Sequence, residues 1–336
     1  MATYKGIQGY TVQKVSTDPT AANVEGQLWY NSDSGKFKIA VGAAGAWASG
    51  GSLNTARKGM PGAGTTTAGL VFGGYLSPPG AIRSAVTESY NGTSWTEVAD
   101  LNTPRRYGGG CGTQTAAVSV GGDTPPSTAN CETWNGTSWT EVSNLTTARK
   151  NINNAATGTT TAALLAGGGE PAMSNTETFN GTSWTEVGDI LEDLMNNVVV
   201  GTNTAALCID GQPNSGPPWA DKTNMLWNGT SWTEQNDTNT GRSMGGGSGT
   251  TTLAIVFAGD ITGASSFTAN TETWNGTSWT EVGNLAAATA NVAAGSVGAT
   301  SSSTFTAGGV TPGASMLATT QEFDGAPVTA KTVTVS

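Results

Sequence analysis

The sequence predicts an all-β protein, a six-bladed β-propeller with four-stranded antiparallel blades, preceded by a short N-terminal arm and hairpin. The nonapeptide WNGTSWTEV recurs with small changes, at intervals of 44 to 48 residues. The Asn-Gly pairs of its copies begin at Asn91, Asn135, Asn180, Asn228 and Asn275. Gly supplies 48 of 336 residues and charged residues only 11%, which suits short strands and tight turns. A period in the forties built from such strands is typical of propeller blades.

Residues 1–46 lie outside the repeat, and we expect an arm followed by a β-hairpin. Segments 27–31 and 36–41 flank a run of turn residues, and apolar side chains alternate in the second segment. The first 15 residues lack the continuous apolar core of a signal peptide, so the ordinary secretory route is not expected. This region would attach the chain to another protein; the alternative is a disordered leader.

Each of the following units predicts the same four strands. An inner strand leads through a Gly-Thr-Thr-Thr type of turn into an apolar strand, which ends at Gly-Gly in four units and at a single Gly, Gly211 or Gly259, in the fourth and fifth. A loop of variable sequence then leads to a third strand, which an Asn-Gly-Thr-Ser hairpin joins to an outer strand beginning with Trp. We place the units at about 53–100, 101–144, 145–189, 190–237, 238–284 and 285–336.

The last unit lacks the Trp of an outer strand, because Phe323-Asp-Gly325 replaces the usual hairpin motif there. Trp47 precedes Leu53 by the spacing that separates the outer-strand Trp from the next apolar residue in other units. We therefore predict that the strand around Trp47 closes the last blade and that the propeller covers residues 47–336. Such closure removes the open sheet edge that favours aggregation.

Comparison of the copies predicts an ion pair within most blades. Arg stands ten residues after the outer-strand Trp, and Glu stands two residues before the aromatic-Asn-Gly, in the same four units. Positions that vary together usually touch, so we expect partly buried pairs. The pairs would be Arg57 with Glu88, Arg105 with Glu132, Arg149 with Glu177, and Arg242 with Glu272. In the alternative, the arginines form an anion-binding ring at the channel mouth, although the glutamates would neutralise it.

Composition excludes several classes of chemistry. The chain has no His, a net charge of −10 and three Cys without a CxxC motif. We therefore expect no cofactor, no metal site, no catalytic residues and no nucleic-acid partner. No apolar run approaches the length of a membrane span, so membrane insertion is not expected. The repeated Asn-Gly-Thr matches the glycosylation pattern, but a hairpin turn explains it better.

The variable loops are the predicted binding surface, because specificity is normally placed in loops that differ on a repeated scaffold. They carry aromatic, rigid or cationic residues suited to a saccharide or protein surface. These candidate binding residues are Tyr75, Pro78, Arg106, Pro217, Trp219 and Phe267. Arg106 has no counterpart in the pattern of paired arginines, which favours an exposed contact. The alternative is that the aromatic and proline residues only cap the core.

The unit resembles the kelch repeat over roughly residues 47–325. The resemblance comprises the Gly-Gly that ends the second strand, the Tyr or Trp of the third and the Trp of the fourth, and the fourth unit departs from it at Asp210-Gly211 and Met225. The WNGTSWTEV copies, with Gly26-Gln-Leu-Trp-Tyr-Asn31 and Gly35-Lys-Phe-Lys-Ile39, are also similar to kelch-like structural proteins of tailed bacteriophages. That resemblance implies a tail or fibre protein that attaches to other virion proteins through residues 1–46 and displays its propeller outward.

We accordingly expect a non-enzymatic virion protein, assembled in the host cytoplasm and present in multiple copies per particle. It would adhere to a host-surface glycan or receptor, or contact other virion proteins. The alternatives are a carbohydrate-active enzyme on the same scaffold and a capsid decoration protein. Oxidation chemistry like that of galactose oxidase needs His ligands for copper, and the chain has no His. Sialidase-like chemistry needs an arginine cluster with a Tyr and a Glu, and the repeated arginines here are expected to be paired. Fold alone does not decide between these functions.

Overall fold

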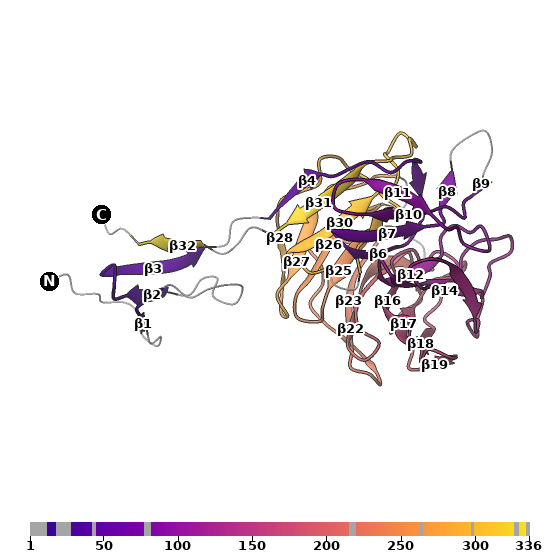
Figure 1. Cartoon of the computed structure of the whole chain (residues 1–336). Helices are drawn as coiled ribbons and strands as arrows, with labels where there is room; N and C mark the ends of the chain where they lie inside the picture. The colour runs from indigo at the N-terminus through magenta and orange to yellow at the C-terminus, as the bar shows by residue number, and fades with distance from the viewer. Residues whose placement is uncertain are drawn as a thin grey trace. The chain divides into compact units, whose positions relative to one another are not determined.

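The computed structural model describes residues 12–17, 28–41, 45–76, 82–214, 220–262, 265–296, 299–325 and 329–333. These residues form strands and turns, with no helix among them. The chain divides into two compact units (Figure 1). The propeller unit is Ala46–Asp324, and the terminal unit combines Met1–Gly45 with Gly325–Ser336.

Six sheets of the described residues make up most of the propeller unit. The first contains β6 (Gly62–Thr65), β7 (Ala68–Phe72), β10 (Thr87–Tyr90) and β11 (Trp95–Val98). The second contains β12 (Gly109–Thr113), β13 (Ala116–Val120), β14 (Cys131–Trp134) and β15 (Trp139–Val142). The third contains β16 (Ala156–Thr159), β17 (Ala162–Ala166), β18 (Thr176–Phe179) and β19 (Trp184–Glu186).

The remaining sheets of the propeller unit follow the same pattern. The fourth contains β20 (Leu194–Met195), β21 (Val198–Gly201), β22 (Ala206–Pro213), β23 (Asp221–Trp227) and β24 (Trp232–Glu234). The fifth contains β25 (Gly246–Gly249), β26 (Ala254–Phe257), β27 (Thr271–Trp274) and β28 (Trp279–Glu281). The sixth contains β29 (Ala293–Ala294), β30 (Ser303–Ala307), β31 (Thr320–Asp324) and β4 (Ala46–Ser49). A small extra sheet joins β5 (Arg57–Lys58), β8 (Tyr75–Leu76) and β9 (Ile82–Arg83).

The predicted all-β propeller fold is confirmed by how these sheets are arranged. Neighbouring inner strands contact each other in the cyclic order β6, β12, β16, β21, β25, β29 and back to β6. At least one backbone hydrogen bond joins each pair of neighbouring units, for example Tyr107 N to Gly59 O at 2.8 Å and Gly59 N to Asn291 O at 3.0 Å. The ring of sheets is therefore closed.

The sixth sheet contains both ends of the propeller unit. Its third strand, β31, is hydrogen-bonded to β4, with Phe323 opposite Trp47. The Trp47 indole packs against Phe257 of the fifth sheet, with ring centroids 4.8 Å apart. Strand β4 therefore fills the outer position of the last sheet, and the β31 edge is covered.

The predicted C-terminal boundary is wrong. Residues 325–336 belong to the terminal unit, not to a propeller of 47–336 or a last unit of 285–336. Because β4 already occupies the outer position, the chain after Asp324 has no place in the sixth sheet. Instead β32 (Thr329–Thr332) pairs with β3 (Lys36–Val41), which pairs in turn with β2 (Leu28–Asn31). Residues Gln13–Val15 form β1, a strand parallel to β2, where an arm was predicted.

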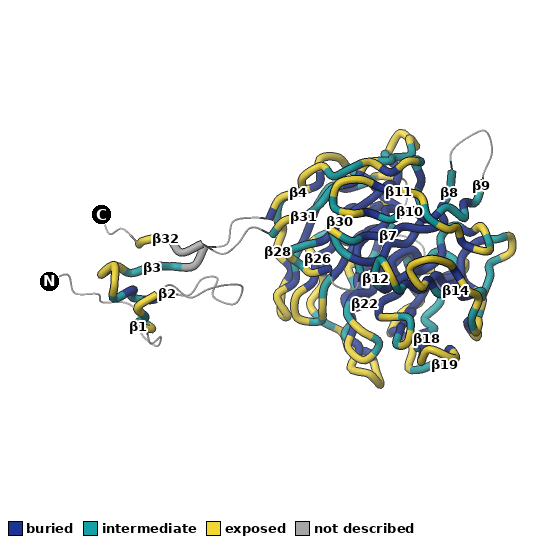
Figure 2. Tube along the Cα trace, in the orientation of Figure 1, coloured by how far each residue is buried: buried dark blue, intermediate teal, exposed yellow. Residues whose placement is uncertain are grey.

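The repeated hairpin turn has a local cause. In the second unit the Asn135 side-chain oxygen accepts hydrogen bonds from the backbone N–H groups of Thr137 and Ser138, both at 2.9 Å. Gly136, which lies between Asn135 and Thr137, adopts φ +91°, a conformation that Gly tolerates without steric cost. The turn brings Trp134 opposite Trp139, with ring centroids 5.4 Å apart. The buried residues follow the strands, and the turns are exposed (Figure 2).

Candidate functional site

The variable loops and the links between units lie on one face of the propeller unit. In an antiparallel sheet of four strands, alternate connections lie at opposite ends. The loop after the second strand therefore shares a face with the link into the next unit's inner strand, and we call this the loop face. The Asn-Gly-Thr-Ser turns lie on the other face, which we call the turn face.

A group of cations surrounds Tyr75 on the loop face, at the junction of the first and second units. The Arg106 guanidinium carbon lies 4.7 Å from the Tyr75 ring centroid and 5.1 Å from that of Tyr107. Lys58 Nζ lies 5.5 Å from the Tyr75 centroid. We call Lys58, Tyr75, Arg83, Arg106, Tyr107 and Asp123 the cationic cluster. Cations over aromatic rings are attracted by the ring quadrupole.

Asp123 holds two of these cations in place. Its carboxylate accepts a hydrogen bond from Arg106 Nε at 2.7 Å and one from Arg83 Nη2 at 3.1 Å. Arg83 Nε also donates to the Asp123 backbone carbonyl at 3.1 Å. Burial alone would raise the pKa of Asp123, but the two arginines lower it below its ordinary value. Asp123 therefore stays ionised and orients both guanidinium groups.

The local backbone explains why these side chains meet. Lys58 and Tyr75 are paired across β5 and β8, and Tyr75 lies opposite Arg83 across β8 and β9. Arg106 forms a backbone bridge with Asp123. The small sheet thus places Lys58, Tyr75 and Arg83 side by side, and the bridge carries Arg106 toward them from the second unit.

The residues predicted for binding are not all in one place. Tyr75 and Arg106 are in contact, whereas Pro78, Pro217 and Trp219 lie outside the described residues. Phe267 is half-buried and forms a bridge with Asp260 in the fifth unit, which borders neither the first nor the second unit in the ring. Sequence reasoning missed Lys58, Arg83, Tyr107 and Asp123. Lys58 and Arg106 occupy the same position of their units, directly after the paired arginine. This correspondence could have predicted Lys58 as a second candidate binding residue.

The four arginine–glutamate ion pairs are present and are fully buried, whereas partly buried pairs were predicted. Arg57 Nη2 lies 2.7 Å from Glu88 Oε1, and its Nη1 donates to the carbonyls of Gly73 and Val86 at 2.9 and 2.7 Å. The other Glu88 oxygen accepts from the Asn54 backbone and side chain, both at 2.8 Å. These arginines are therefore occupied inside the blades and do not form an anion-binding ring at the channel mouth.

The axis of the propeller unit is filled on the loop-face side. Asn153 and Asn154 are an insertion in the third unit relative to the others. Asn154 Nδ2 donates to the carbonyls of Gly245 and Val292, at 2.8 and 3.0 Å, and both acceptors lie across the axis in the fifth and sixth units. Asn153 Nδ2 contacts Asn291 Oδ1 at 3.3 Å. The two side chains thus join opposite parts of the ring.

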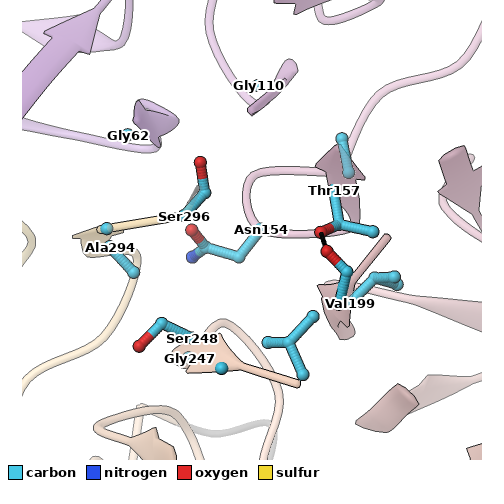
Figure 3. A pocket seen from close by; sticks show the side chains of 14 residues that line it. Gly62, Gly110, Asn154, Thr157, Val199, Gly247, Ser248, Ala294 and Ser296 are labelled. Atoms are coloured by element: carbon cyan, nitrogen blue, oxygen red, sulfur yellow. Dashed lines mark hydrogen bonds between the residues drawn. The ribbon is translucent and has the colours of Figure 1, made fainter. Parts of the chain in front are cut away.

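A small pocket lies along the axis beside this insertion (Figure 3). Asn154, Thr157, Ser248 and Ser296 supply polar side chains to its wall, and glycines of the inner strands supply much of the rest. Its volume is about 20 Å³, and a cavity needs about 10 to 15 Å³ for one water molecule. The axial pocket therefore accommodates water but not a sugar ring.

Comparison with known proteins supports the architecture. No protein-family model matches the chain, and no curated protein matches it in sequence. A solved structure titled "Structure of YjhT" superposes with a TM-score of 0.62 and 13% identity, covering 85% of this chain and 97% of that chain. The fold is that of a β-propeller. At this identity the likeness bears on fold alone.

On the propeller, other chemistry-bearing groups are separated from one another. Within the described part of the chain, no group of three or more Cys, Asp or Glu side chains is placed to hold a metal ion. The three Cys are buried free thiols, and burial raises the pKa of Cys131 and of Cys208 to about 12. The described residues contain no helix that is long and apolar enough to cross a membrane. The cationic cluster is thus the strongest candidate site on the described surface.

Proposed function

We propose that this chain is a non-enzymatic structural protein of a bacteriophage virion, with its propeller unit displayed from the tail or a fibre and binding a host surface. The supporting observation is the contrast between the two faces. The turn face repeats one Asn-Gly-Thr-Ser motif, whereas each loop of the loop face differs and one junction carries the cationic cluster. A repeated scaffold with unlike loops on one face is the usual design of a binding module.

The features of the terminal unit favour a role in attachment, which is separate from the binding role of the propeller unit. It contains the hairpin β2–β3, whose sequence is the part that resembles tail and fibre proteins of phages. Its sheet also includes β32 from the other end of the chain, so both ends belong to one structural element. We propose that this unit attaches the chain to neighbouring virion proteins, and that several copies are assembled into each particle.

Mass spectrometry and labelling of purified particles test the virion assignment. We expect the chain among the structural proteins, and an antibody against the propeller unit to label the tail or a fibre in electron micrographs. Particles without the chain would refute the assignment, and label spread over the capsid would favour a decoration protein.

A competition assay tests the binding function. Purified protein added to host cells before the phage should lower the fraction of particles that adsorb. A matched protein with the turn-face segment 181–183 replaced by Gly and Ser should compete as well as the parent protein, because the proposed binding surface is the loop face. Release of sugars from host polysaccharide by the purified chain, abolished by replacing one carboxylate, would contradict the non-enzymatic proposal.

A further inference from the structure

We infer that the cationic cluster binds an acidic saccharide, with a carboxylate or sulfate of the sugar held by Arg106 and Lys58. This inference rests on the proposed binding of a host surface and names the chemistry of the ligand. The cluster contains three cations, Lys58, Arg83 and Arg106, and one carboxylate, Asp123. On a chain of net charge −10 it is a local excess of positive charge.

Lys58 carries the uncompensated charge. Among the described residues, no carboxylate lies within ion-pairing distance of its ammonium group. Burial and the nearby charge of Arg106 lower the pKa of Lys58, which shows that the environment disfavours the bare cation. The negative charge of a bound ligand would favour the Lys58 cation and so offset both effects.

Arg106 has donors to spare. Its Nε is bonded to Asp123, and within the described residues no hydrogen bond joins either of its terminal nitrogens to an acceptor. Its side chain is 22% exposed and that of Arg83 is 24% exposed. Two parallel N–H groups of a guanidinium fit the two oxygens of a carboxylate or sulfate. Asp123 and the rings of Tyr75 and Tyr107 fix this guanidinium in advance, which lowers the entropy lost on binding.

The third unit offers an internal comparison. Lys150 occupies the position of Lys58 and Arg106 in its own unit, but its ammonium is 2.6 Å from Glu170. That cation is therefore neutralised within the protein. Among the cations that directly follow a blade arginine, Lys58 is the one without a carboxylate partner in the described residues, and it lies at the junction of the first and second units beside Tyr75 and Tyr107.

A single sugar acid suits the cluster better than a nucleic acid does. Nucleic-acid affinity requires cations spread along many phosphates, whereas the excess here is local and the whole chain is acidic. The Tyr hydroxyls can also bond to sugar hydroxyls.

Titration calorimetry on the full chain tests the inference. The probes are an oligouronate, a sulfated oligosaccharide and a neutral oligosaccharide of similar length. We expect at least one acidic probe to bind, with an affinity that falls as salt is added, and the neutral probe to bind at least about tenfold more weakly. The acidic probe that binds identifies the anion.

Three variants separate the site from general charge effects. Arg106→Gln and Lys58→Gln should each weaken binding by about tenfold. Lys150→Gln, which removes the same charge at the paired position, should change the affinity by less than about twofold. Lys58→Gln breaks no ion pair, so its loss of binding would not reflect misfolding; equal thermal unfolding of all variants is the control.

Several outcomes would overturn the inference. They are the absence of binding by both acidic probes, equal binding of the neutral probe, equal loss in Lys150→Gln, and full competition by duplex DNA. These outcomes are separable from failure of the virion assignment. Particles that contain the chain while no acidic sugar binds would refute this inference alone, whereas sugar binding by a chain absent from particles would refute only the virion role.

Discussion

Arg105 shows what one side chain does in this repeat. Its Nη1 donates to the carbonyls of Gly121 and Asn130, at 3.2 and 2.8 Å, and its Nη2 pairs with Glu132. The carbonyls mark the end of the second strand and the approach to the third. One buried guanidinium thus ties the variable loop's two ends to the blade, so that the loop can vary while its anchor stays constant.

A double-mutant cycle tests this pair. Arg105→Ala should destabilise the protein by about 3 to 5 kcal/mol, because it leaves the buried Glu132 carboxylate without its ion-pair partner and removes the hydrogen bonds to the carbonyls of Gly121 and Asn130. The double variant Arg105→Leu/Glu132→Met copies the buried Leu194 and Met225 of the fourth unit and should be less destabilised than Arg105→Ala. Chemical denaturation measures both. Strictly additive losses for Arg105→Ala and Glu132→Ala would show that the two residues are not coupled.

Asp210 is an exception at the same scale. It stands where the first, second, third and sixth units have the first Gly of the Gly-Gly pair and the fifth has Ala258, and it keeps the left-handed backbone, with φ 53°. Its carboxyl is buried, accepts from Thr238 Oγ1 at 2.5 Å and lies 3.2 Å from Arg242 Nε. Arg242 also pairs with Glu272, so one cation serves two carboxyl groups.

We predict that Asp210→Asn is more stable than the parent protein at neutral pH. Burial raises the pKa of Asp210 well above its ordinary value. The folded state therefore binds this proton more tightly than the unfolded state, and the resulting stability is present at low pH and lost as pH rises through the folded-state pKa. The difference in unfolding free energy between variant and parent should grow from acidic to neutral pH. A difference independent of pH would contradict the raised pKa.

At the scale of elements, the outer strands join one blade to the next. Trp139 Nε1 donates to Thr87 Oγ1 of the preceding unit at 3.0 Å, and Trp95 Nε1 donates to Thr320 Oγ1 at 2.9 Å. Trp47 Nε1 bonds to Thr271 Oγ1 at 2.9 Å in the same way. The Trp of WNGTSW therefore forms the contact between blades as well as filling its own.

The third unit breaks this pattern, which allows a stabilising substitution. Cys131 stands where the first and third units have Thr, and the Trp184 Nε1 that faces this position has no oxygen acceptor within the described residues. Cys131→Thr should raise the unfolding free energy by about 1 kcal/mol by supplying one. Thr87→Ala, which removes the equivalent acceptor, should lower it by about the same amount. Thermal and denaturant unfolding measure the stability of both variants. If Cys131→Thr is no more stable than the parent protein, Trp184 does not form a stabilising hydrogen bond with the new Thr hydroxyl.

At the scale of the whole molecule, the ring depends on one strand from the opposite end of the propeller unit. Strand β4 covers the edge of β31, and Glu322 of β31 accepts a hydrogen bond from Tyr90 Oη of the first sheet at 2.5 Å. The closing strand and this contact therefore join the first and last sheets, in addition to the Trp95–Thr320 hydrogen bond.

Two truncations separate closure of the ring from the terminal unit. Removing residues 1–49 exposes the β31 edge, so the propeller should lose most of its cooperativity and aggregate. Of the described strands, removing residues 325–336 takes away β32 alone. It should leave propeller unfolding unchanged while exposing the amides of β3 to hydrogen exchange. Hydrogen exchange with mass spectrometry follows both regions. Unchanged exchange in β3 would show that β32 does not protect it.

The local features of this fold were predictable because they are repeated and encoded by neighbouring residues. The Asn-Gly turns, the apolar second strands and the outer-strand Trp recur in successive units, so their spacing alone predicts strands and a propeller. The Arg and Glu pairs were visible for the same reason, since both partners are absent together in the fourth and sixth units. Their complete burial was not visible, because burial depends on how the loop folds over them.

The sequence by itself determined the propeller fold, its repeated strands and the identity of the paired charges. Only the tertiary structure decided where unlike residues meet. Lys58, Tyr75 and Arg83 come together through the small sheet of the first unit, Arg106 and Asp123 join them from the second, and Asn154 bonds to Gly245 across the axis. The union of β3 with β32 is of the same kind. These contacts are not repeated from unit to unit, so the repeat does not reveal them. They depend on how the loops, and the segments on either side of the propeller unit, pair in the folded chain.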